Sequence, residues 1–181
     1  MDTDILTLQN QVETQTYYWS QIENLIQELK TNEEQSEAID SLLIFPITDN
    51  IVSLNSSAFE LLENRGIDLI SDETLRKEIV SHFKYDQQRL LDKSKAWQDI
   101  LLDFGLWYDV FLDPIIDREE INNYTLGSER FKTLNYADFR SNPLLISRLK
   151  YRIHRKIREV ELIKEFIKKK ERLRGLIAEA I

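Results

Sequence analysis

The sequence predicts an all-α fold: an elongated helical bundle in which long antiparallel N- and C-terminal helices form a stalk. The 181 residues include only four Gly and three Pro, so few positions interrupt a helix. Strong helix formers (Leu, Glu, Lys, Gln, Arg) dominate the composition. Near both ends of the chain, apolar residues recur at alternating spacings of three and four, which is the period of one helix face. We expect residues 1–181 to be a single helical domain, as is usual at this length.

The first predicted element is a long helix over residues 1–45. Its apolar seam runs from Ile5 to Leu29, and Gln15 is the one polar side chain in it. The stretch that begins at Thr31 either continues this helix or starts a second one. Pro46 ends it, because proline lacks the backbone N–H that a helix interior needs.

Residues 54–113 are expected to form the middle helices. Asn55 or Ser56 caps the first of them, and Gly66 follows its last turn, where a left-handed backbone commonly closes a helix. Ser71 is the expected N-cap of the next helix, whose apolar face continues almost to the end of this range.

Residues 114–141 show no sustained period and are expected to be an irregular connection with one short helix near residues 135–139. Asn142 and Pro143 then signal a new helix start, since Pro favours the first helical position. The C-terminal helix over residues 142–181 would be about 60 Å long at 1.5 Å per residue. Three basic residues occupy positions in its otherwise apolar seam: Lys156, Lys170 and Arg174.

Opposite charges gather at the two ends of the chain. Residues 1–40 hold nine acidic residues and one lysine, whereas residues 148–174 hold twelve Lys/Arg and four Glu. This contrast favours side-by-side packing of the terminal helices. The alternative is a basic face that binds nucleic acid or lipid headgroups. The net charge of −8 opposes nucleic-acid binding, and we expect no such partner. The alternative basic face would consist of Arg152, Arg155, Lys156 and Lys169.

Few residues offer catalytic or ligand chemistry. There is no Cys, and His82 and His154 lie on different predicted helices without a second His one turn away. The isolated glycines form no phosphate-binding loop. We therefore expect no metal, no cofactor and no catalytic residue. The alternative is a small-ligand binder or enzyme that uses the aromatic and acidic region 103–113. Its pocket would be lined by Asp103, Trp107, Tyr108 and Asp109.

Two segments carry a resemblance to a known family. In AFELLENRGIDLISDETLRKEI, residues 58–79, a helix ends at Gly66, an apolar pair follows, and a new helix starts with an Asp/Glu-Leu-Arg pattern. In NPLLISRLKYRIH, residues 142–154, Asn-Pro leads the final helix. Both segments resemble a bacterial family of unknown function, whose members are small proteins with an N-terminal membrane anchor and a helical extracytoplasmic domain.

The resemblance covers roughly residues 20–181 and implies no catalytic residues. It implies a non-enzymatic interaction or sensor domain with a protein partner, or one that self-associates. It also implies a place outside a bacterial inner membrane, held by an anchor that precedes residue 1. No run in the sequence reaches the roughly 20 apolar residues that span a bilayer, so the expected anchor is absent from this chain. Without an anchor, the expected location is cytoplasmic.

Overall fold

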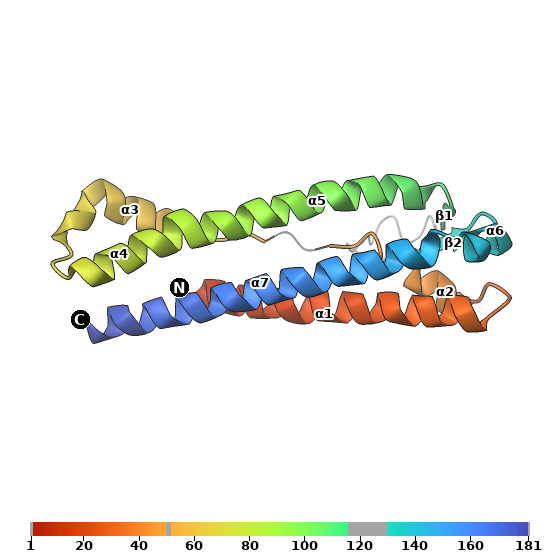
Figure 1. Ribbon diagram of the computed structural model, residues 1–181, viewed down its shortest axis with the longest axis horizontal. Helices are drawn as coiled ribbons and strands as arrows, with labels where there is room; N and C mark the ends of the chain where they lie inside the picture. Colours follow the sequence, from red (N-terminus) through yellow and green to blue (C-terminus); the bar gives the residue numbers. More distant parts are fainter. Residues whose placement is uncertain (1, 50–51, 116–129, 181) are drawn as a thin grey trace. The chain divides into compact units, whose positions relative to one another are not determined.

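The computed structural model describes residues 2–49, 52–115 and 130–180, and within them the all-α prediction is confirmed (Figure 1). Long helices occupy both ends of the chain, and in the described residues only two strands of four residues each accompany the helices. The elements are α1 (Asp2–Thr31), α2 (Glu37–Leu42), α3 (Ser57–Gly66), a 3-10 turn (Ile67–Leu69), α4 (Glu73–Ser81), a π-helical turn (His82–Asp86), α5 (Gln87–Asp109), β1 (Leu112–Ile115), β2 (Arg130–Thr133), α6 (Tyr136–Ser141) and α7 (Leu145–Glu179).

The predicted helix over residues 1–45 is two helices, so the sequence restarts rather than continues. α1 ends at Thr31, and α2 begins after Ser36. The Ser36 hydroxyl accepts a hydrogen bond from the backbone N–H of Ile39 at 3.3 Å, which satisfies a donor that the first helical turn cannot pair by itself. Pro46 lies beyond the end of α2, in the loop that follows it.

The joint between α3 and α4 matches the predicted helix stop and corrects the predicted cap. Gly66 has φ 107°, a conformation that side chains with a Cβ rarely adopt. The N-cap of α4 is Asp72 and not Ser71. The Asp72 carboxylate accepts hydrogen bonds from the N–H groups of Thr74 at 2.8 Å and Leu75 at 3.0 Å. A carboxylate serves better here because it also opposes the positive end of the helix dipole.

The predicted irregular connection over residues 114–141 contains regular elements in its described part. Its short helix is present as α6, capped by the side chain of Asn135. The strands were not predicted: β1 and β2 pair antiparallel, with Leu112 opposite Thr133. Strands this short carry little periodic signal, and their pairing depends on contacts distant in sequence. Residues 116–129 of the connection lie outside the described residues.

The chain forms two compact units, and each of the three long helices contributes to both. The same three helices therefore belong to both units. The expectation that residues 1–181 form a single domain stays a prediction. Unit 1 comprises Met1–Thr14, Asn50–Ala96 and Glu159–Ile181, and unit 2 comprises Gln15–Asp49 and Trp97–Arg158.

In unit 2, α1 and α7 pack antiparallel, as predicted. Arg140, shortly before α7, donates to the carbonyl of Leu29 near the end of α1 at 2.9 Å. Lys156, farther along α7, donates to Gln15 near the middle of α1 at 2.8 Å. The core of the unit joins apolar side chains of α1, α5, α6 and α7, among them Ile22, Leu25, Phe104, Tyr108, Phe139, Leu149 and Ile153.

In unit 1, the first turns of α1 and the last turns of α7 share a core with α5. The Asp4 carboxylate accepts a hydrogen bond from Lys170 at 2.7 Å, so the acidic and basic helix ends contact each other here too. A second cluster joins α3, α4 and α7 through Phe59, Leu75, Ile79 and Leu173. The apolar members of the first cluster are Ile5, Leu8, Val52, Leu90, Ile163, Phe166 and Ile167.

Candidate functional site

The structure places the four residues of the predicted ligand pocket in different surroundings: Tyr108 and Trp107 pack in the core of unit 2, and Asp103 and Asp109 are exposed. Tyr108 is fully buried in the core of unit 2 and stacks on Phe104, with ring centroids 5.3 Å apart. Burial raises the pKa of the Tyr108 hydroxyl. Trp107 is half-buried beneath the guanidinium of Arg148, 4.3 Å from the ring centroid. The aromatic part of the predicted pocket is therefore core.

The other two residues of that set, Asp103 and Asp109, lie in the solvent-exposed part of α5 beside aliphatic side chains that also face water. Leu102 and Leu106 are 67% and 74% exposed, and Val110, in the turn after α5, is 63% exposed. Residues four apart occupy one face of a helix, one above the other. Together with the exposed Asp99, these side chains make up what we name the α5 outer face: Asp99, Leu102, Asp103, Leu106, Asp109 and Val110.

Carboxylates border the aliphatic side chains of the α5 outer face on the helix surface. Asp99 precedes Leu102 by three residues, and Asp103 and Asp109 lie three residues to either side of Leu106. No ion pair joins any of the three carboxylates to a cation within the described ranges 2–49, 52–115 and 130–180. The face is thus both apolar and acidic.

Gly105 lies next to Leu102 and Asp109 on the surface of α5. A Cβ built at Gly105 would have no atom within 4 Å besides its own helix and neighbours, so packing inside the chain does not require glycine there. Glycine weakens a helix interior relative to alanine. The position therefore leaves a shallow gap at the edge of the α5 outer face.

The predicted basic face is not an exposed surface. Arg152 and Lys156 are buried, at 2% and 0% exposure, because α7 directs them into unit 2. Arg155 is half-buried near the ring of Trp97, 5.9 Å from its centroid. Lys169, in unit 1, is exposed and pairs with Asp86. The prediction of an exposed basic surface that includes Arg152 and Lys156 is therefore wrong.

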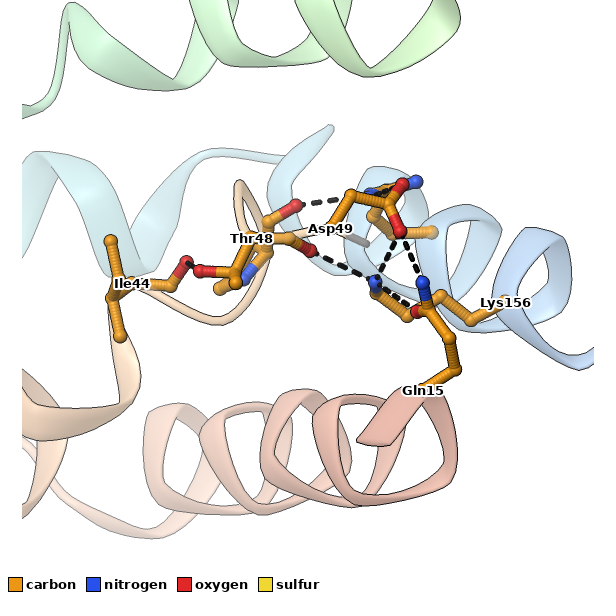
Figure 2. A network of polar contacts seen from close by, with 7 residues as sticks. Gln15, Ile44, Thr48, Asp49 and Lys156 are labelled. Carbon is orange, nitrogen blue, oxygen red and sulfur yellow. Dashed lines mark hydrogen bonds and ion pairs between the residues drawn. The ribbon is translucent and has the colours of Figure 1, made fainter. Parts of the chain in front are cut away.

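These two buried cations instead form a buried polar cluster with Gln15 and Asp49. Figure 2 shows Gln15, Asp49 and Lys156 of this cluster side by side. Arg152 Nη2 lies 3.1 Å from Asp49 Oδ2, and Lys156 Nζ lies 3.5 Å from Asp49 Oδ1. Arg152 also donates to the carbonyl of Pro46 at 3.0 Å, and Lys156 donates to that of Thr48 at 2.9 Å. The cluster therefore fastens the loop after α2 to α7 and α1.

The electrostatics of the buried polar cluster keep its carboxylate ionised. Burial alone would raise the pKa of Asp49, but the charges of Lys156 and Arg152 and the hydrogen bond from Gln15 outweigh it and lower that pKa. Burial, together with the charge of Asp49, raises the pKa of Tyr18, whose ring lies 5.2 Å from Lys156 Nζ. Because the side chain of Asp49 is only 8% exposed, the arrangement can hold a loop but gives a substrate no access.

A second buried titratable group lies in unit 1. His82 is buried against Phe166, with ring centroids 4.8 Å apart. Burial and the charge of Lys170 lower the His82 pKa to about 4, so the ring is neutral near pH 7. In the part of the chain that the structure describes, no group of three His, Asp or Glu side chains could hold a metal ion.

A groove of about 770 Å³ in unit 1 has the size of a small-ligand site. Its two acids, Asp4 and Glu60, contact Lys170 and Ser56. The ring of Phe83 stacks on Phe59 at 4.7 Å. The polar and aromatic groups of the groove thus serve contacts inside the unit.

Leu102, Leu106 and Val110 were not predicted from the sequence as functional candidates. A signal was present, because the three residues repeat at intervals of four and so form a second apolar stripe on the helix that carries Phe104 and Tyr108. A helix that is apolar on two faces needs a second surface to cover it.

No family model matches the chain, and no curated protein or solved structure matches it. Among residues 2–49, 52–115 and 130–180, no helix is long and apolar enough to span a lipid bilayer.

Proposed function

We propose that this protein is a non-enzymatic interaction module that binds a protein partner through the α5 outer face. The observation that carries the proposal is the exposure of Leu102 and Leu106 on one face of α5 and of Val110 in the turn that follows, each more than 60% accessible. Single exposed aliphatic residues are ordinary on a protein surface, whereas a contiguous group is typical of a binding surface.

The energetics of burial support this proposal. An amphipathic helix normally turns polar side chains to water and apolar ones to the core. On α5 the core side is supplied by Phe104 and Tyr108, and the outer leucines lie outside the core cluster of unit 2. Complete burial of one such side chain is worth about 1.5–3 kcal/mol. A partner that covers Leu102 and Leu106 would gain much of this.

The absence of enzymatic activity is proposed from the same geometry. The aromatic residues beside Asp103 and Asp109 are occupied in the core, and the buried polar cluster encloses its charged groups. Turnover of ester, phosphate or glycoside substrates that disappeared in Asp103→Asn would contradict this part of the proposal.

We also propose that the module works outside a bacterial inner membrane. The support for this is the resemblance of residues 58–79 and 142–154 to an anchored extracytoplasmic family. An apolar run of about 20 residues encoded upstream of residue 1 would be the expected anchor. A natural start at residue 1 would remove this part of the proposal and leave the interaction surface unaffected.

Site-specific photocrosslinking in the source cells tests the interaction surface. A photoreactive amino acid at position 106 should give a discrete adduct with a partner, because the side chain faces outward on α5. Position 150 provides a matched control, since Lys150 is exposed on α7 and outside the proposed surface. Equal adduct patterns at both positions would overturn the proposal.

A further inference from the structure

We infer that the α5 outer face binds a basic amphipathic helix: a partner segment with an aliphatic stripe flanked by Lys or Arg. The inference rests on the proposed function, because it names the class of partner for the same surface. It follows from two features of the face, the carboxylates beside its aliphatic residues and the open position at Gly105.

The charges select a basic partner. Asp99, Asp103 and Asp109 have no ion-pair cation in the parts of the chain that the structure describes. A partner that covers Leu106 must bring its own side chains close to Asp103 and Asp109. Acidic side chains there would repel, and Lys or Arg would attract and also speed association.

The same negative charges disfavour other occupants of the α5 outer face. A second copy that used the same face would bring two sets of three carboxylates together. Segment 116–129 of this chain holds four acidic residues and one arginine, so the carboxylates of the α5 outer face would repel it as well. Anionic lipid headgroups would be repelled in the same way.

The shape of the face suits a helix. Leu102 and Leu106 are spaced by about one turn, or about 6 Å along the helix axis at 1.5 Å per residue, and Val110 follows in the turn after α5. Packed helices lie about 8–10 Å apart, and small residues at the contact permit the closer distances. Gly105 supplies such a small residue at the edge of the face, where no described residue outside α5 approaches within 4 Å of the position that a Cβ would take.

Two designed helical peptides of about 18 residues are the probes. Both carry the same leucine stripe, which is flanked by Lys in one peptide and by Glu in the other. Binding to the full chain is measured by isothermal titration calorimetry. Methyl chemical shifts of Leu102, Leu106 and Val110 locate the bound peptide.

We expect the Lys-flanked peptide to bind, to shift these methyl signals, and to bind more weakly as salt rises. Asp103→Lys and Leu106→Gln should each weaken it about tenfold, since the first reverses a charge pair and the second removes an apolar contact. Lys150→Gln is the matched control, and it should leave the affinity unchanged. Circular dichroism checks that each variant keeps its helices.

Gly105→Ala separates a partner contact from a structural role. Alanine fits the open position and favours the helix, so the melting temperature should rise. The added methyl group should nevertheless weaken the binding of the Lys-flanked peptide. A variant that melts higher and binds equally well would show that no partner approaches at Gly105 and would overturn this part of the inference.

Other outcomes distinguish the inference from the proposed function. If the Glu-flanked peptide binds the α5 outer face as tightly as the Lys-flanked one, the inference of a basic partner is wrong, and the proposal that this face is a docking surface is retained. If the Lys-flanked peptide shifts only methyl signals outside α5, the inference is wrong. A dimer of this chain that Leu106→Gln dissociates would make a second copy the occupant and overturn the inference. If neither peptide binds and crosslinking at position 106 equals that at position 150, both fail.

Discussion

Lys156 Nζ donates a hydrogen bond to Gln15 Oε1 at 2.8 Å, which joins two residues 141 positions apart in the sequence. Each is a polar exception in an apolar seam, Gln15 in α1 and Lys156 in α7. Sliding one helix past the other by a turn would place each polar group against apolar side chains, which is costly in a buried site. The pair therefore favours one register of α1 on α7.

Removal of the Asp49 carboxylate should destabilise the protein strongly. Asp49→Ala leaves Arg152 and Lys156 buried without their shared anion, and loss of one partner from a buried pair costs about 3–5 kcal/mol. The free energy of unfolding in urea measures the effect. Asp113→Ala is the matched control, because Asp113 forms an exposed pair with Lys132 that should contribute only about 0–1 kcal/mol. Equal effects of the two changes would contradict the assignment.

The same carboxylate should contribute to acid sensitivity. The pKa of Asp49 is lowered in the folded protein, so its stabilising contribution is fully present above the unfolded value of about 3.9. The contribution is lost as the pH falls from there through the folded pKa. Unfolding free energies of the parent protein and Asp49→Asn should therefore converge at strongly acidic pH. A constant difference down to pH 2 would exclude this linkage.

His82 should make the protein less stable as the pH falls, over a higher pH range than Asp49 does. The His82 pKa is about 4 in the folded protein and about 6.5 in the unfolded chain. Between these pH values the unfolded chain binds a proton at His82 and the folded protein does not. Stability should decline as the pH falls from about 6.5 to about 4, by up to about 3 kcal/mol. Below that range the folded protein takes up the proton as well, and this contribution becomes constant.

The second histidine provides the control for that experiment. His82→Phe should remove the decline, because a phenyl ring can stack on Phe166 and does not titrate. His154→Gln should retain it, since His154 is exposed on α7. If the two variants share the parent's pH profile, His82 is not the responsible group.

The joint between α3 and α4 should respond to Gly66 and Asp72. Gly66→Ala should cost about 1 kcal/mol or more, because alanine at φ 107° is strained. Asp72→Ala should cost about 1 kcal/mol through loss of the cap, whereas Ser71→Ala should have little effect. Thermal unfolding of the three variants decides between Asp72 and Ser71 as the cap.

Two neighbouring positions of α5 should differ sharply in stability. Tyr108→Ala removes a fully buried ring and should cost about 3–5 kcal/mol. Leu106→Gln changes an outward side chain and should alter the free energy of unfolding by less than about 0.5 kcal/mol. A large loss in Leu106→Gln would show that Leu106 packs within the chain, which would remove the basis of the proposed surface.

The sequence predicted the features of the fold that depend on local pattern. The seams from Ile5 to Leu29 and from Ile146 onward predicted long terminal helices, and Gly66 predicted a helix stop, because helix period and glycine backbone freedom act locally. The pairing of β1 with β2 escaped prediction, since it joins segments separated by residues 116–129. Its stability depends on contacts that a short strand does not encode.

The candidate site was predicted only in part. Asp103 and Asp109, which the sequence predicted as pocket residues, are exposed on α5, but periodicity alone could not tell that the aromatic Tyr108 faces the core while Leu106 faces water. Both lie in one nearly continuous apolar run, 104–112, in which only Gly105 and Asp109 are not apolar. Which side of such a helix is covered depends on its neighbours, here α6 and α7, through the contacts of Tyr108 and Trp107.

The burial of basic side chains on α7 changes what an approaching ion encounters. Arg152, Lys156 and Lys170 belong to the twelve bases of residues 148–174, yet they are inside the protein and bound to Asp49 and Asp4. Arg152 and Lys156 share the Asp49 carboxylate and Lys170 pairs with Asp4, so two nearby anions offset most of these three charges and weaken the potential that they add to the surrounding solution. A polyanion or an anionic resin would therefore meet a weaker positive field than the twelve bases of this segment suggest.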